Sequence, residues 1–192
     1  MRAYEVTTPA STPVLTTAEA KTHLKVDITT DDTLIDNLIA SATLISQEYT
    51  NRFFFNTTIT QKGNNFDDLK ELYKSTVGSV THIKYYDNND ALQTLATSVY
   101  YLNNVVQPAQ ISLKVSQSFP SVADKQNAVE CEYVVGYGAS ASDVPEAIKQ
   151  AVLLTVGNWY ENRSSVVIGR ISTELPMSAK WLLDSYKVQV IR

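Results

Sequence analysis

The spacing of apolar residues changes twice along the chain and divides it into three parts. Toward both ends, apolar residues recur every three or four positions, which is typical of amphipathic helices. In the middle they alternate with polar residues, which is typical of half-buried strands. We therefore predict an α+β fold, in which N- and C-terminal helices form a small bundle and a β-rich insertion separates the second helix from the third. The expected division assigns residues 1–56 and 137–192 to the helical core and residues 57–136 to the insertion.

The N-terminal part begins with an extended leader. Residues 7–14 contain two prolines and no helical pattern. Thr16 and Glu19 have the spacing of a capping box, in which each side chain binds a backbone N–H of the first helical turn. This spacing predicts a short first helix that ends near Leu24.

The second helix has the clearest pattern in the sequence. Thr30, Asp31 and Asp32 supply a cap and an acidic first turn, which the positive end of the helix dipole favours. Seven apolar residues then follow at helical spacing and form one stripe: Leu34, Ile35, Leu38, Ile39, Ala42, Ile45 and Tyr49.

The middle part predicts several short strands rich in Val, Ile, Thr and Tyr. The predicted strands cover residues 57–61, 79–86, 91–95, 98–102, 111–115 and 128–135. Asn and Asp at residues 87–90 favour a turn because they tolerate left-handed backbone. The polar stretch at residues 117–127 contains a proline and predicts a loop.

A third helix is expected from Val144 to about Asn162. Asp143 and Glu146 have the spacing of a second box-like cap, with Pro145 in the permissive first turn. Apolar residues occur on several faces of this helix, so we expect it to be covered on more than one side. Gly157 costs about 1 kcal/mol relative to Ala within a helix, which favours a close neighbouring backbone at this position.

A short fourth helix starts at Pro176 and leads into an alternating tail at residues 187–192. Its apolar surface exceeds what so short a helix buries within itself, and aromatic residues often dominate interfaces. The tail alternation suits addition of a strand to a partner's sheet. We hypothesise that this segment contacts a partner through five residues: Trp181, Leu182, Tyr186, Val188 and Val190. The alternative is that the helix only covers the core of its own domain.

Composition and charge narrow the classes of function. The chain has 16 Lys and Arg against 20 Asp and Glu, a net charge of −4, and no dense basic cluster. Strong non-specific binding to nucleic acid needs concentrated cations, so phosphate binding is not expected as the main affinity. The first residues lack the apolar segment of a signal peptide, and no stretch has the length of a membrane span. We therefore expect assembly in a cytoplasm, without membrane association.

The residues that carry chemistry are few and scattered. His23 and His82 are the only histidines, and Cys131 is the only cysteine. No zinc-protease or phosphate-loop motif is present, and Cys131 alternates with apolar residues as a packed side chain would. The acidic pair Asp31 and Asp32 is explained by helix capping. These observations predict no catalytic site, no cofactor and no metal site.

Several strings, in the same order and spread over nearly the whole chain, resemble a family of head–tail connector proteins of long-tailed bacteriophages and prophages. The strings are PVLTTAEAKTHLKVD at 13–27, DDxLIxxLIxxA at 31–42, YTNR at 49–52, GYG at 136–138, VPxxIKQA at 144–151 and NWYENR at 158–163. Five residues of these strings form the motif core: Leu34, Leu38, Trp159, Tyr160 and Arg163. The middle of the chain, residues 62–127, carries little of the motif.

The resemblance implies a structural protein of the virion neck, assembled in the host bacterial cytoplasm. Such an adaptor docks beneath the portal protein as a ring, usually of twelve copies, and lets DNA pass through its lumen without specific binding. It presents a surface to the next neck protein, a stopper or tail terminator, and the family has no catalytic residues to transfer. Two alternatives stay open, namely another neck or tail-completion protein, and a soluble enzyme or regulator of assembly.

Overall fold

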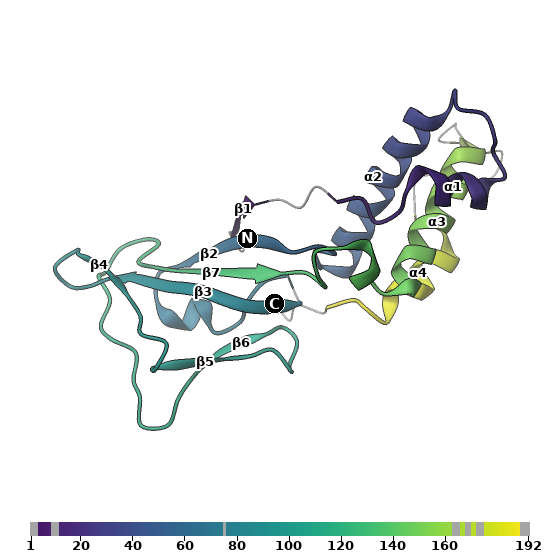
Figure 1. The fold of residues 1–192 in the computed structure, drawn as a ribbon. Coiled ribbons are helices and arrows are strands. Elements are labelled where there is room, and N and C mark those ends of the chain that lie inside the picture. The colour runs from purple at the N-terminus through teal and green to yellow at the C-terminus, as the bar shows by residue number, and fades with distance from the viewer. Residues whose placement is uncertain are drawn as a thin grey trace. The chain divides into compact units, whose positions relative to one another are not determined.

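The computed structural model describes residues 4–8, 12–74, 76–162, 166–167, 170–171 and 175–188. The chain divides into two compact units (Figure 1). We call the first the sheet unit; it comprises Met1–Ala10, Phe55–Tyr137 and Val188–Arg192. The second, the helical unit, comprises Ser11–Phe54 and Gly138–Lys187. Helices and antiparallel sheet occur together, which confirms the predicted α+β class.

A five-stranded antiparallel sheet forms the centre of the sheet unit. Its strand order is β1-β2-β7-β3-β4. The strands are β1 (Tyr4–Thr8), β2 (Thr57–Gly63), β3 (Val77–Tyr86), β4 (Leu92–Thr94) and β7 (Val129–Val135). The predicted strands of the middle part are thus present, within a few residues of their expected ends.

One face of this sheet is buried and the other is polar, as the alternation predicts. In β7, Cys131 and Tyr133 are fully buried, whereas Glu130 and Glu132 between them lie on the opposite, half-exposed face. On that polar face His82 of β3 lies 3.7 Å from a carboxylate oxygen of Glu132. The register of β2, β7 and β3 therefore places the apolar residues on one side and the charged residues on the other.

The hairpin of β5 (Tyr100–Asn103) and β6 (Gln110–Leu113) is a separate two-stranded sheet of the same unit. Two backbone hydrogen bonds attach it to the segment at residues 70–72: Leu72 donates to the carbonyl of Ala109 at 2.8 Å, and Ile111 donates to that of Lys70 at 3.1 Å. Within the hairpin, the side chains of Tyr100 and Ile111 are buried. The hairpin is thus held in place by its backbone as well as by its side chains.

A buried polar network joins the core strands to the same segment. The Tyr133 hydroxyl lies 2.9 Å from Oε1 of Gln61 and accepts a hydrogen bond from the Tyr73 N–H at 3.0 Å. Nε2 of Gln61 donates to the carbonyls of Asp68 and Glu71 at 2.9 and 3.0 Å. Each of these buried groups therefore has a partner, which a low-dielectric interior requires.

The helical unit contains α1 (Thr17–Leu24), α2 (Asp32–Thr50), α3 (Glu146–Glu161) and α4 (Met177–Asp184). Helix α3 contacts the other three. It buries Ile148, Ala151, Val152, Thr155 and Val156. This central position agrees with its apolar residues on several faces. None of the described helices has the length and apolar character needed to cross a membrane.

The cap predicted for the first helix is confirmed, whereas the cap predicted for the third helix is wrong. Thr16 and Glu19 form the expected capping box on α1. Asp143 instead accepts hydrogen bonds from Ser140 and closes a separate 3₁₀ helix, Ala141–Asp143. Val144 is extended, as residues before a proline usually are, so α3 begins only after Pro145.

Two further expectations differ from the structure. Gly157 faces no neighbouring backbone: a Cβ added there would lie 3.5 Å from Nε2 of His23 and 3.9 Å from a side-chain carbon of Leu24. Tyr4–Thr8, which the expected division places with the helical core, instead pairs as β1 with β2. Backbone hydrogen bonding to an open sheet edge accounts for this strand, because it buries almost no side chain.

Candidate partner-binding surface

Helix α4 carries an apolar pair on its solvent-facing side. Pro176 has the φ of a residue that starts a helix, and the helix follows it directly. Ala179 and Leu183, four residues apart, are fully buried. Met177 and Trp181, also four residues apart, lie on the other side of the helix, and each exposes 74% of its surface. One face of α4 thus covers the core, while the other presents two large apolar side chains to solvent.

The end of α4 is attached to the end of α2. The Tyr49 hydroxyl donates to Asp184 at 2.6 Å, and the Arg52 guanidinium donates to the carbonyl of Tyr186. The ammonium of Lys187 lies 4.4 Å from the centre of the Tyr49 ring. The hydrogen bond to Asp184 raises the pKa of the Tyr49 phenol. These contacts hold α4 in one orientation on the helical unit.

The predicted contact residues have different environments. Trp181 is exposed, Leu182 and Tyr186 are half-buried, and Val188 is buried. Val190 lies outside the described residues. Of the four described residues, Trp181 therefore offers the largest exposed fraction.

Sequence reasoning missed Met177 as a companion of Trp181. The signal was present: the two residues are separated by one helical turn directly after Pro176, and such pairs share a helix face. We call Met177 and Trp181 together the α4 patch.

The four motif-core residues that the structure describes lie on α2 and α3. Leu34, Leu38, Trp159 and Tyr160 are half-buried, and Arg163 lies outside the described residues. The Tyr160 hydroxyl donates to the Asp31 carboxylate at 2.6 Å. Asp31 occupies the expected N-cap position of α2 and Asp32 its acidic first turn, but the Asp31 side chain makes no capping hydrogen bond and instead joins α2 to α3.

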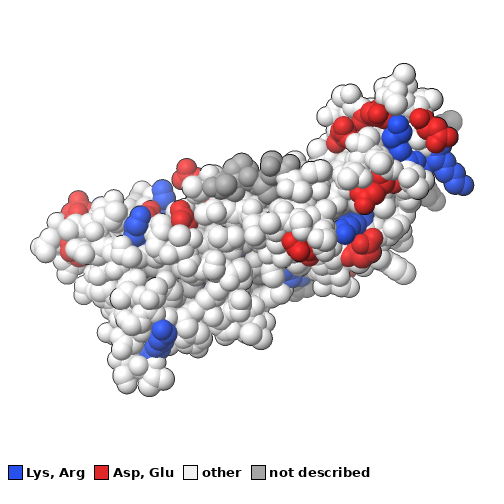
Figure 2. All heavy atoms as spheres, in the orientation of Figure 1, with Lys and Arg blue, Asp and Glu red and all other residues white. Residues whose placement is uncertain are grey.

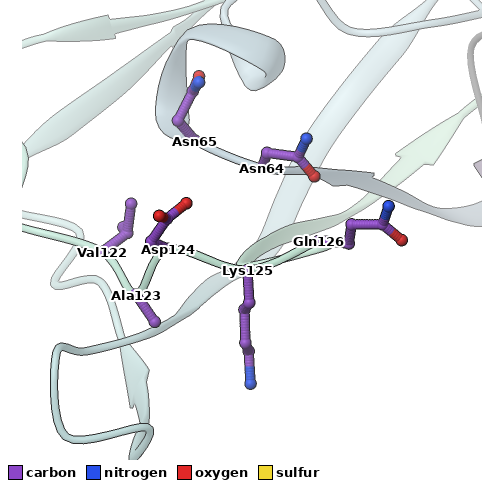
Figure 3. A pocket seen from close by; sticks show the side chains of 7 residues that line it. All are labelled: Asn64, Asn65, Val122, Ala123, Asp124, Lys125 and Gln126. Atoms are coloured by element: carbon purple, nitrogen blue, oxygen red, sulfur yellow. The ribbon is translucent and has the colours of Figure 1, made fainter.

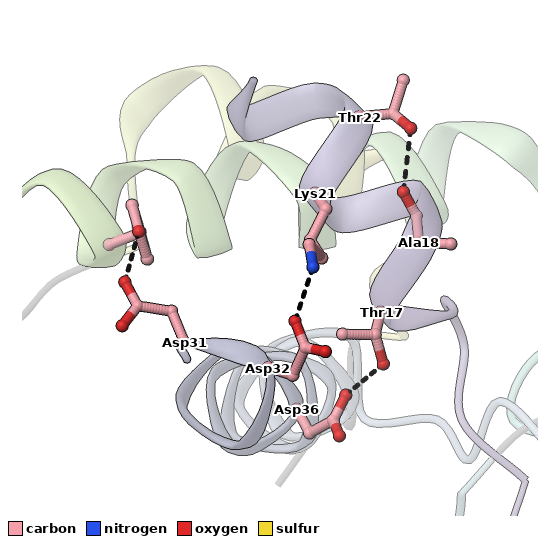
Figure 4. A network of polar contacts seen from close by, with 8 residues as sticks. Thr17, Ala18, Lys21, Thr22, Asp31, Asp32 and Asp36 are labelled. Atoms are coloured by element: carbon pink, nitrogen blue, oxygen red, sulfur yellow. Dashed lines mark hydrogen bonds and ion pairs between the residues drawn. The ribbon is translucent and has the colours of Figure 1, made fainter. Parts of the chain in front are cut away.

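Further polar contacts join α1 to the start of α2 (Figure 4). Lys21 forms an ion pair with Asp32 at 2.7 Å, and Thr17 donates to Asp36. Asp31 thus binds α3, whereas Asp32 and Asp36 both bind α1. Because several side chains must be placed together, this clustered network supports one arrangement of α1, α2 and α3.

The residues that could carry chemistry are not assembled into a site. Cys131 is fully buried, and burial raises the pKa of its thiol to about 12. His82 lies in the sheet unit, opposite Glu130 and Glu132, whereas His23 lies against Gly157 in the helical unit. Among the described residues, no three His, Cys, Asp or Glu side chains are grouped as metal ligands would be.

Two pockets in the described part of the chain are lined mainly by polar residues, some of which already bind within the chain. One, of about 500 Å³, is lined by Asn64, Asn65 and residues 122–126 (Figure 3). Lys125 points away from the two asparagines, pairs with Asp90 and lies 3.1 Å from the centre of the Tyr86 ring. Asn64 accepts the Asn127 N–H at 3.0 Å. Charged groups therefore do not converge on a ligand position.

A second pocket, of about 460 Å³, lies beside α1 and is lined by Ala18, Lys21, Thr22 and residues 25–27. Its Lys21 ammonium already binds Asp32.

Comparisons with known proteins identify solved structures of the same fold and one protein family. No curated protein matches the sequence. Among solved structures, a chain from the neck of an empty gene transfer agent particle has a TM-score of 0.78 and 17% identity, over 99% of this chain and 97% of that one. A chain of the native gene transfer agent virion matches with a TM-score of 0.77 and 18% identity, over 98% and 97%.

A third chain, from the neck of the native particle computed with C12 symmetry, gives a TM-score of 0.76 and 18% identity, over 99% and 97%. At such identities the likeness shows a shared fold. The family comparison covers residues 13–188 and matches head completion protein. This match confirms the resemblance that the sequence motifs indicated. The chain therefore belongs to the head completion protein family.

Proposed function

We propose that this chain is a structural subunit of the neck of a phage or phage-like particle. In this proposal, twelve copies form a ring beneath the portal protein, DNA passes through the ring, and its far side receives a stopper or tail terminator. The observation that carries the proposal is the head completion family match over residues 13–188. The shared fold with chains from gene transfer agent necks, one of them computed with C12 symmetry, supports it.

The proposed role is mechanical and needs no catalysis. A ring subunit has to keep one shape while neighbours, portal and DNA press on it. The polar network around Tyr133 and the attachment of α4 to α2 provide such rigidity within each unit. The net charge of −4 per copy favours a lumen that repels DNA, which then slides instead of binding.

Deletion of the gene, followed by electron microscopy of the particles, tests the proposed role. We expect heads that package DNA but stay tailless or lose their DNA, together with recovery when the wild-type chain is supplied. Mass spectrometry of purified particles is expected to find the chain at a fixed copy number per portal. Density in another part of the tail would favour a different completion protein. Absence from particles would favour a soluble assembly factor and contradict the proposal.

We further propose that the α4 patch is part of the contact with the portal. Exposed aromatic side chains beside other apolar groups are typical anchors of interfaces. Truncation after residue 173 is too severe a test, because it also removes Ala179 and Leu183 from the core. Point substitutions on the exposed face of α4 test partner contact without disturbing the residues that cover the core.

Trp181→Asp is expected to fold normally and yet fail to join DNA-filled heads. Its matched control is Leu44→Asp, which adds the same charge on α2, where Leu44 is 60% exposed. Thermal unfolding checks that both variants fold. Normal joining by a folded Trp181→Asp variant would show that the α4 patch does not contact the portal.

A further inference from the structure

One stretch of the chain is almost free of charge. The residues from 91 to 123 contain a single charged side chain, Lys114, whereas the chain average of 19% would give about six in that length. This stretch includes β4, the β5–β6 hairpin and the loop that follows it. Figure 2 shows a largely uncharged surface over the region of the hairpin. Surfaces exposed to water normally carry more charge than this.

Apolar side chains are exposed on the same hairpin. Val105 in the connecting loop and Val115 just after β6 expose 90% and 93% of their surfaces. Tyr101, Val106 and Leu113 are also exposed. We call these five residues the hairpin patch. Leaving such side chains in water forgoes the stabilisation that burial against a partner would provide.

The outer face of the hairpin, which carries Tyr101, has uncharged polar side chains, whereas Leu113 is paired with the buried Tyr100 on the opposite face. Tyr101 lies opposite Ser112, and Asn103 lies opposite Gln110. Residues opposite one another in an antiparallel pair point to the same side, so these four share the outer face. Tyrosine and uncharged polar groups with few charges are typical of the centre of a protein interface. The backbone hydrogen bonds to residues 70–72 preorganise this surface for binding.

The charges favour a second copy of this chain as the partner. Each copy has a net charge of −4, so neighbouring copies repel one another wherever carboxylates face carboxylates. The stretch from 91 to 123 contains no carboxylate, and its one cation, Lys114, favours an acidic neighbour. DNA does not fit here, because binding phosphates requires clustered cations.

We propose that the hairpin patch is the surface through which one copy contacts the next copy in the ring. This inference rests on the proposed neck function, whose ring requires side-by-side contacts. A closed ring is built from heterologous contacts, in which two different surfaces meet. The hairpin patch therefore binds a surface of the neighbour outside its own hairpin.

Photo-crosslinking tests which partner lies on the patch. p-Benzoylphenylalanine is placed at position 105, and both assembled particles and the purified full chain at high concentration are irradiated. We expect an adduct of two chains, each of 21.3 kDa. Mass spectrometry is expected to map its second site outside residues 96–123. Adducts only to another particle protein, or only between two hairpins, would overturn the inference.

A matched pair of variants tests the energetics in solution. Val105→Asp with Val115→Asp is compared with Ile28→Asp with Leu44→Asp, which adds the same charge at exposed apolar positions of the helical unit. In sedimentation equilibrium, we expect the dissociation constant for self-association to rise about tenfold or more in the hairpin variant. The control variant is expected to keep the wild-type value. Thermal unfolding checks that both variants fold. Equal association of the two variants would overturn the inference.

The two assays also separate this inference from the neck function. If the chain is absent from particles, the proposed function fails, while the purified chain still shows whether the hairpin patch binds a second copy. If the chain is present and its position-105 adducts contain only the portal or a tail protein, the neck function stands and the hairpin inference fails.

Discussion

At the scale of single residues, Gly136 occupies a position that no other residue type fits. Its φ is +133°, and a Cβ added there would lie 2.4 Å from the Phe55 backbone. This glycine follows β7 directly, where the backbone of residues 55 and 56 passes close by. The GYG motif of the sequence thus has a steric cause at its first glycine.

Gly136→Ala is expected to lower the free energy of unfolding by about 3 kcal/mol or more, because both strain and overlap must be relieved. Gly78→Ala is the matched control: a Cβ there would meet only the Val134 carbonyl at 3.8 Å. We expect the control to change stability by about 1 kcal/mol or less. Urea unfolding of both variants provides the measurement, and similar midpoints would contradict the steric account.

The thiol of Cys131 is expected to be inert while the protein is folded. Burial raises its pKa to about 12 from an ordinary value of 9.0, so the nucleophilic thiolate is nearly absent at pH 8. Between pH 9 and 12 only the unfolded chain ionises this thiol. The free energy of unfolding is therefore unaffected by Cys131 below pH 9 and falls as the pH rises toward 12. An aromatic disulfide reagent should react only after denaturation with guanidinium. Rapid reaction of the native protein at pH 8 would show that the thiol is accessible.

At the scale of elements, capping residues differ in whether their side chains bind the helix backbone or a residue distant in sequence. Thr16 and Glu19 bind one another and start α1 as the local pattern predicts. Asp31 has the position of a cap but binds Tyr160, which is distant in sequence and close in the folded unit. Local spacing can identify a capping residue, yet a hydrogen-bond donor from a distant part of the chain can bind its side chain in place of the helix N–H groups.

Tyr160→Phe is expected to lower the stability of the protein by about 1 kcal/mol, because it removes the hydrogen bond to the partly exposed Asp31 carboxylate. Tyr101→Phe removes a hydroxyl from an exposed ring and serves as the control, with an expected change near zero. Thermal or urea unfolding measures both. An equal loss in the two variants would indicate that the Asp31 contact contributes nothing specific.

At the scale of the whole molecule, the charge distribution limits what the free chain binds. The net charge of −4 and the lack of a dense basic cluster predict poor binding to duplex DNA at physiological salt. An electrophoretic shift assay at that salt should show no complex below micromolar protein. Submicromolar affinity would contradict a sliding role for the lumen and favour a DNA-binding function.

The assembly state of the free chain is a second expectation at this scale. The sequence lacks long apolar heptads, and the hairpin patch has few large side chains, so we expect a monomer or a weak oligomer at low micromolar concentration. A stable ring then forms mainly on the portal, where twelve copies are held side by side. Light scattering of the purified chain measures this, and a tight ring without portal would contradict it.

The sequence by itself determined the fold class, most element boundaries and the family. Periodicities of two and of three to four reflect which side chains face a core, and the core dominates the free energy of folding. The strands of the middle part and the stripe of α2 were therefore predictable within a few residues. The motifs over residues 13–163 were specific enough for the family, which the match to head completion protein confirmed.

Only the tertiary structure decided which apolar residues are exposed to solvent and so available for contact with a partner. Trp181 and Leu182 are adjacent and equally apolar, yet the packing of Ala179 and Leu183 against the core turns Trp181 outward. The pairing of β1 with β2 and the contact of Tyr160 with Asp31 likewise join residues far apart in sequence. Such contacts depend on which distant surfaces meet, and local periodicity carries no information about that choice.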